Sequence, residues 1–114
     1  MEVAGVQLMV REVPSAPNNE LRNLADTLRE KLKSGVVVLA TRGDGKVTLI
    51  VTVSKDLTGK VQAGRLAGTL AQLVGGRGGG RPDFAQAGGK EPDKLPEMLA
   101  AAPGVLEKAL AVNA

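Results

Sequence analysis

Fifteen residues in the second half of the chain, Gly75 to Gly89 (GGRGGGRPDFAQAGG), hold seven of its fifteen glycines. Glycine has no Cβ atom, so it costs a helix interior about 1 kcal/mol relative to alanine, and it lets two backbones approach closely. This stretch therefore cannot belong to a helix. We expect a glycine-rich loop over residues 75–89, with DFAQA as a candidate short strand inside it.

The first third of the chain has a strand pattern followed by a helix pattern. Val6, Leu8 and Val10 alternate with Gln7, Met9 and Arg11, which is the period of a strand with one buried face. Residues 20–33 place leucines at helical spacing on one face. We expect Asn19 to cap this helix and Gly35 to end it.

Two adjacent strands are predicted next. Val36 to Thr41 is apolar on both faces, which indicates an interior strand, and residues 47–54 alternate in part. Asp44-Gly45 between them is a strong signal for a two-residue hairpin turn.

A second helix is predicted over residues 60–74. One side of it is a stripe of small residues, namely Gly64, Ala67, Gly68 and Ala71. Two glycines in a helix require a close packing partner inside the fold or a partner outside it. Further along, residues 95–102 form a helical turn or two, and Pro103 suits the first turn of a separate last helix.

These elements predict one α/β domain over residues 1–114, a two-layer sandwich with a mixed sheet and flanking helices. No apolar stretch approaches the roughly 20 residues of a membrane span, so we expect a cytoplasmic protein with no membrane partner.

Composition excludes most catalytic chemistry. The chain has no cysteine and no histidine, which excludes disulfides, thiolate or imidazole metal sites, and Ser-His or Cys-His relays. Its acidic residues are dispersed without a D-x-D or E-x-x-E cluster. We therefore expect no catalytic residue and no metal ligand.

Positive charge is concentrated in the same part of the chain as the glycines. Residues 42–90 carry eight basic and three acidic side chains, whereas the flanking segments are neutral or acidic. Arg77 and Arg81 border the three central glycines, and Pro82 favours an extended Arg81. Successive glycines with positive φ could expose N–H groups to an anion. Two interpretations stay open, an anion-binding loop or a tight loop whose arginines only aid solubility.

The stretch LAQLVGGRGGGRPDFAQAGG, Leu70 to Gly89, with the following KLPEMLAAAPGVLEKAL, resembles the C-terminal domain of alanyl-tRNA synthetases. That domain shares its fold with the DHHA1 domain of DHH-family phosphoesterases. The likeness extends more loosely upstream and covers about residues 36–110. It implies a DHHA1-like fold, and an RNA-binding tail, cut from a longer parent, that contacts the tRNA elbow and helps the aminoacylation and editing domains act on one tRNA.

The same resemblance implies that this segment has no active site and no cofactor of its own. The parent would use ATP, magnesium and zinc in other domains. Matching the glycine pattern position by position gives these candidate RNA contacts: Gly75, Gly76, Gly78, Gly79, Gly80, Arg81, Gln86, Gly88 and Gly89.

Nearby cations complete the predicted interface. We expect phosphate contacts from the side chains of Arg77, Arg81, Lys60, Arg65 and Lys90. With Phe84 as the sole aromatic residue, the domain should recognise a preformed RNA shape and its backbone, and Phe84 itself should belong to the core.

Two alternatives remain beside the tRNA-binding module. The small-residue stripe and the last helix could form a homodimer interface, which sedimentation of the isolated chain would detect. The chain could also be the substrate-binding DHHA1 domain of a DHH phosphoesterase, detached from its catalytic part.

Overall fold

The computed structural model describes residues 1–112 and contains a six-stranded mixed sheet in the order β1-β2-β3-β4-β6-β5. Its strands are β1 (Glu2–Val3), β2 (Val6–Glu12), β3 (Val36–Gly43), β4 (Lys46–Val53), β5 (Arg77–Gly80) and β6 (Phe84–Gly89). Its helices are α1 (Asn18–Leu32), α2 (Ala63–Gln72) and α3 (Leu95–Val112), with short 3-10 turns η1 (Lys55–Leu57) and η2 (Pro92–Lys94). Strands β2 and β3 are parallel, and all other neighbouring strands are antiparallel.

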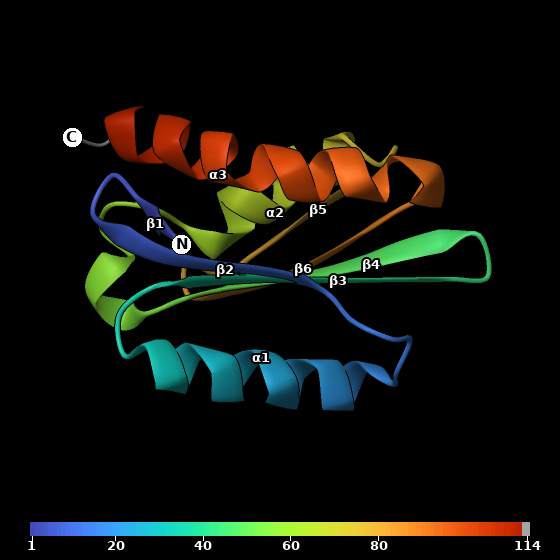
Figure 1. The fold of residues 1–114 in the computed structure, drawn as a ribbon, viewed down its shortest axis with the longest axis horizontal. Coiled ribbons are helices and arrows are strands. Elements are labelled where there is room, and N and C mark those ends of the chain that lie inside the picture. The colour runs from blue at the N-terminus through green and yellow to red at the C-terminus, as the bar shows by residue number, and fades with distance from the viewer. Residues whose placement is uncertain (113–114) are drawn as a thin grey trace.

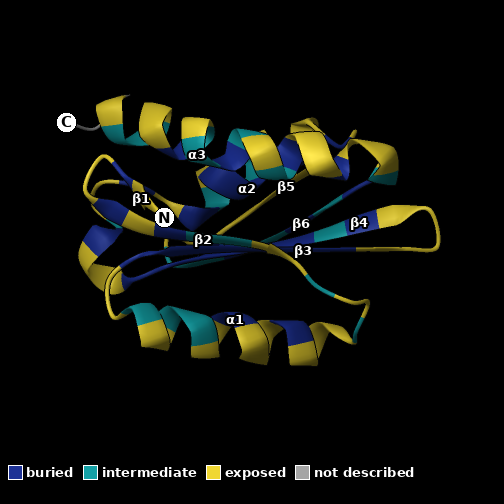
Figure 2. Cartoon of the chain, viewed as in Figure 1, coloured by how far each residue is buried: buried dark blue, intermediate teal, exposed yellow. Residues whose placement is uncertain are grey.

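Helices cover both faces of this sheet, with α1 on one side and α2 and α3 on the other (Figure 1). The α/β class, the mixed sheet and the flanking helices are thus confirmed. The layers number three instead of the expected two, because the β2-α1-β3 crossover places α1 opposite the later helices. Burial follows this arrangement, with the most continuous buried band between the sheet and the α2–α3 layer (Figure 2).

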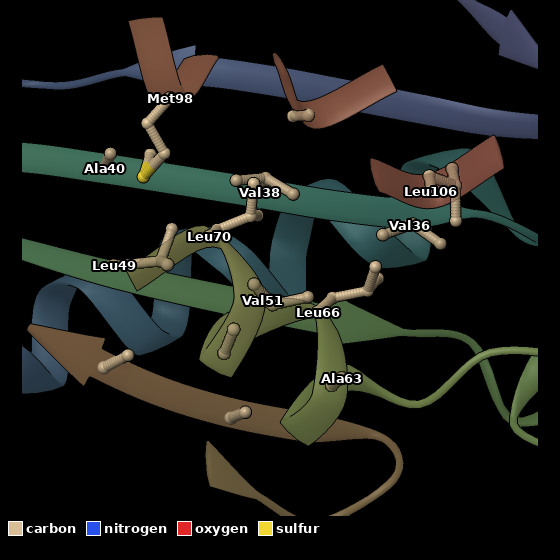
Figure 3. Close-up of a cluster of buried hydrophobic side chains, with 14 of the residues drawn as sticks. Val36, Val38, Ala40, Leu49, Val51, Ala63, Leu66, Leu70, Met98 and Leu106 are labelled. Carbon is tan, nitrogen blue, oxygen red and sulfur yellow. The ribbon is translucent and has the colours of Figure 1, made fainter. Parts of the chain in front are cut away.

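Two apolar clusters form the core. The larger lies under α2 and α3 and includes Val36 and Val38 of β3, Leu70 of α2, and Met98 and Leu106 of α3 (Figure 3). The smaller lies under α1 and includes Leu21, Ala25, Val37, Leu39 and Ile50, with Phe84 packed against it. Phe84 is therefore a core residue at the margin of the α1 side, as the sequence suggested.

The predicted turn between β3 and β4 is confirmed. Asp44 and Gly45 have φ angles of 55° and 74°. Positive φ at both central residues matches the twist of antiparallel strands, which is why Asp-Gly is favoured there.

Both predicted ends of α1 are wrong by a few residues. The cap position is taken by Pro17, and no side chain of the described residues caps the helix, so Asn19 lies in its first turn. Lys33 has φ 62° and ends the helix in place of Gly35. Gly35 instead permits a close approach, because a Cβ there would lie 2.8 Å from the carbonyl oxygen of Gln7.

Helix α3 is continuous through Pro103, where the sequence predicted a break. An internal proline removes one helical hydrogen bond and costs about 3 kcal/mol. The buried face of α3 runs along both sides of the proline, with Met98 and Leu106 at 0% and 1% exposure. Packing of that face favours one uninterrupted helix.

The glycine-rich stretch is a β-hairpin, not the expected loop. Strands β5 and β6 pair antiparallel around a turn at Pro82 and Asp83, which confirms the candidate strand over DFAQA. Within residues 75–89, all of them in the described range, only Gly75 has positive φ, at 72°. The expected nest of successive positive-φ glycines is therefore not formed.

Candidate nucleic-acid interface

The small-residue stripe of α2 packs against β5. A Cβ atom at Gly64 would lie 2.7 Å from the carbonyl oxygen of Gly80, and one at Gly68 would lie 3.2 Å from that of Gly78. The N–H of Gly64 also donates to the carbonyl of Arg81 at 3.2 Å. The stripe therefore has its close partner within the fold, and it does not offer a surface to a second copy of the chain.

The glycines of β5 also face close neighbours in β6. A Cβ at Gly80 would lie 2.8 Å from Ala85 Cα, and one at Gly78 would collide with Ala87. Gly79 differs, because no atom of the described residues lies within 4 Å of a Cβ built there. Most of these glycines thus have a packing reason, and Gly79 marks the open side of the strand.

That open side belongs to the α1 face of the sheet. Opposite residues of an antiparallel pair project to the same face. Gly79 lies opposite Gln86, and Arg77 lies opposite Gly88. Since β6 alternates and Phe84 packs on the α1 cluster, Gln86 and Gly88 share that face. Helix α1 packs mainly on β3 and β4 and reaches β6 at Phe84, whereas every residue of β5 is exposed.

An open groove of about 800 Å³ lies at one end of this uncovered surface. It brings together the following predicted contacts: Gly75, Gly76, Arg77, Gln86, Gly88, Gly89 and Lys90. The groove also contains Asn18, Lys46 and Thr48, which the sequence alone did not indicate. None of the described residues that line it is acidic. The arrangement therefore suits a polyanion.

Lys46 and Thr48 reach the groove through strand register. Val47 lies opposite Gly89 and Thr48 opposite Gly88, so the start of β4 is beside the end of β6. Only the pairing of β4 with β6 could have revealed this, because the two strands are far apart in sequence. Close by, Glu91 packs against Gly75 and forms an ion pair with Lys94 (Nζ–Oε1 3.8 Å).

Arg81 lies outside the groove. It is four residues beyond Arg77 along an extended chain, which corresponds to about 13 Å. Its side chain is 76% exposed and its Nε lies 3.8 Å from Asp83 Oδ1, in a separate hollow beside α1. The two arginines therefore border opposite ends of the hairpin instead of a single loop.

Lys60 and Arg65 lie elsewhere. Lys60 borders a hollow between the β1–β2 turn and the end of α3, and Arg65 borders one between α2 and α3. The structure does not bring either side chain together with the basic groove. Gly78 and Gly80 are part of β5 and pack against α2 and β6.

Two other kinds of site are absent from residues 1–112. No three histidine, cysteine, aspartate or glutamate side chains of this range gather as metal ligands would. No helix in the same range combines the length and the apolar character needed to cross a membrane.

Comparison with known proteins agrees with this geometry. The model of the DHHA1 domain family matches residues 5–108. Curated relatives include the alanine–tRNA ligases of Dechloromonas aromatica, 50% identical over 94% of this chain and 12% of that protein, and of Shewanella loihica, 55% identical over 86% and 11%. The chain thus spans about an eighth of the length of such relatives.

A solved structure gives the same result. The crystal structure of the C-Ala domain from Aquifex aeolicus alanyl-tRNA synthetase superposes with a TM-score of 0.86 at 37% identity, over 94% of this chain and 96% of that one. The family match, the curated relatives and the solved structure agree. The chain belongs to the DHHA1 domain family, in the form that occurs as the C-terminal domain of alanyl-tRNA synthetases.

Proposed function

We propose that this domain binds tRNA through the basic groove and the adjoining open side of β5. One observation carries the proposal: Lys46, Arg77 and Lys90 converge on a groove that no described acidic side chain lines. Cations placed this way release counterions from a phosphate backbone, which supplies most of the affinity of such interfaces. The small residues at Gly79 and Gly88 keep the surface flat, so a rigid RNA contour can approach it.

The recognition should depend on shape and backbone. A double-helical RNA presents phosphates and 2′-hydroxyls more readily than base edges. The elbow of a tRNA is a preformed surface of this kind, and we propose it as the contact. A domain with few phosphate contacts binds weakly by itself, but tethering to a parent enzyme raises its effective concentration.

In the parent, the domain would keep one tRNA bound while the aminoacylation and editing domains act on it in the cytoplasm. This segment would contribute no catalytic residue. ATP, magnesium and zinc would be used by the other domains, as expected for an alanine–tRNA ligase.

The test is a titration of the chain with tRNA at several salt concentrations. A triple variant, Lys46→Ala/Arg77→Ala/Lys90→Ala, should bind more weakly, and the slope of log K against log salt should fall by about 2 to 3 units. The matched control, Lys31→Ala/Lys55→Ala/Lys108→Ala, removes the same charge elsewhere and should retain the slope of the parent chain.

Equal loss of binding in both triple variants would mean that net charge acts without a defined site. Unchanged binding in the groove variant would exclude the groove as the tRNA contact. A dimer in sedimentation experiments that is indifferent to tRNA would support the homodimer alternative.

A further inference from the structure

A second hollow, of about 300 Å³, lies between α1 and the β5–β6 turn, on the same face of the sheet as the basic groove. It combines three guanidinium groups, two carboxylates and the chain's only aromatic ring. Its lining residues are Arg22, Asp26, Arg29, Arg81, Asp83 and Phe84. Mixed charge distinguishes this hollow from the groove.

Arg22 forms a flat surface at one side of the hollow. Its Cζ atom lies 5.1 Å from the centroid of the half-buried Phe84 ring, which is the geometry of a cation–π contact. The ring thereby holds the guanidinium plane in place, while the Arg22 residue itself is exposed. Nucleobases stack on arginine planes as they do on aromatic rings. Arg22 is therefore a preorganised stacking surface.

The ion pairs that line the hollow leave some hydrogen-bonding atoms without a close partner. Arg29 Nη2 lies 4.0 Å from Asp26 Oδ1, and Arg81 Nε lies 3.8 Å from Asp83 Oδ1. Both separations exceed a hydrogen bond, so the carboxylate oxygens can still accept hydrogen bonds from a ligand. Arg29 Nε is buried, has no partner among the described residues and has almost no accessible surface. A ligand in the hollow would therefore meet the terminal nitrogens of the Arg29 guanidinium, whose side chain is 25% exposed.

We propose that this hollow receives one unpaired guanine base of the RNA bound in the groove. Guanine presents adjacent N–H donors, on N1 and N2, to a carboxylate of Asp26 or Asp83. Its O6 and N7 atoms accept from arginine, and the terminal nitrogens of Arg29 or Arg81 supply that donor. Its face stacks on Arg22.

The other possible occupants fit less well. A phosphate group would approach two carboxylates and be repelled by both. Adenine lacks the pair of adjacent N–H donors, and its amino group meets the arginine donor where guanine has an acceptor. The proposal rests on the proposed function and adds a base-reading contact to recognition of the backbone.

The experiment follows the Arg29 Nε–H and Phe84 ring resonances of the chain by NMR during titration with 5′-GMP, 5′-AMP or inorganic phosphate. Binding of GMP should shift both resonances, with an affinity about tenfold above that of AMP. Inorganic phosphate should leave the Phe84 ring unmoved. Equal shifts with all three compounds would show an unspecific anion patch, and absence of shifts with GMP would exclude the site.

Two variants sharpen the test. Asp26→Asn/Asp83→Asn should bring the GMP and AMP affinities close together, whereas Asp93→Asn, on η2, should leave the preference intact. Arg22→Lys keeps the charge but removes the planar guanidinium group, so it should weaken the binding of GMP and of AMP alike. Loss of preference in the Asp93 control would overturn the assignment.

Failure here is separable from failure of the proposed function. The groove variant Lys46→Ala/Arg77→Ala/Lys90→Ala changes the salt dependence of tRNA binding without touching the hollow. A chain that binds tRNA through the groove but shows no guanine preference would refute only the base-reading contact.

Discussion

The two faces of the sheet differ in how completely they are covered. Under α2 and α3 the sheet is closed by aliphatic side chains (Figure 3) and by glycine-to-glycine contacts at β5. Under α1 it is closed mainly over β3 and β4, and the β5–β6 hairpin borders a basic groove and a mixed-charge hollow. One hairpin thus packs against a helix on one side and lies open on the other, and substitutions on the two sides should have separate effects.

The largest effect is expected for Gly64→Val, on the closed side. A branched side chain would displace the backbone of Gly80, which lies 2.7 Å from the Cβ position. Overpacking of this kind costs about 3 kcal/mol or more of unfolding free energy. Urea denaturation measures it. An unfolding midpoint equal to that of the parent chain would contradict the packing of α2 on β5.

A matched pair within β5 tests its two sides directly. Gly80→Ala should destabilise the fold by about 1 to 3 kcal/mol, because the new Cβ meets Ala85 Cα at 2.8 Å. Gly79→Ala meets no described atom within 4 Å and should change stability by about 0.5 kcal/mol at most. Thermal unfolding of both variants provides the comparison. Equal losses would mean that β5 has no open side.

Gly104→Ala should stabilise the protein. This residue is inside α3, has no positive φ, and no described atom lies within 4 Å of its Cβ position. Alanine there should raise the unfolding free energy by about 0.5 to 1 kcal/mol. Comparison with Gly64→Val shows whether a helical glycine without a close neighbour tolerates a side chain better than Gly64 does. A loss of stability in Gly104→Ala would contradict that difference.

The smallest effect concerns how the far end of α1 is attached to the sheet. Ser34 Oγ donates to Asp56 Oδ2 at 2.5 Å, and this hydrogen bond, with a lesser one from Ser54, lowers the pKa of the Asp56 carboxyl from its ordinary value. A lowered folded-state pKa stabilises the fold above the unfolded-state pKa, and this contribution disappears as pH falls through the folded value.

Ser34→Ala should therefore raise the pKa of Asp56 toward the ordinary value of an aspartate and slightly lower the stability near pH 7. An NMR titration of the Asp56 carboxyl measures the shift, with Asp93 as the reference carboxyl. A pKa of Asp56 that stays unchanged would show that Ser34 does not control it.

Local patterns predicted the elements that are stabilised locally. Strand β2, the apolar β3 and the Asp44-Gly45 turn follow from side-chain alternation and backbone preferences within a few residues. Pro103 shows the opposite case. The preference of proline for a first helical turn predicted a new helix there, but burial of the residues on both sides favours one continuous helix. The ends of α1 differ for a similar reason, since Gly35 is required by its approach to Gln7 and not by the helix.

The candidate site was predictable only in part. The glycine pattern indicated the groove residues of β5 and β6, but a run of glycines has no alternation, so it concealed a strand. Lys46 joins the groove only because β4 pairs with β6, and Arg22 joins the hollow because α1 crosses the sheet beside the hairpin. Contacts of this kind depend on tertiary register, which the sequence does not display.

The contact between α2 and β5 has a consequence for behaviour at high concentration. Arg81 pairs with Phe84 across the turn, so the carbonyls of Gly78 and Gly80 point away from β6, toward Gly68 and Gly64. An exposed outer strand without side chains would otherwise be a template for strand addition by a second molecule. The helix shields that template, and at the opposite border β1 has only two residues. Intermolecular growth of the sheet is therefore disfavoured at both borders, although β5 carries three glycines in succession.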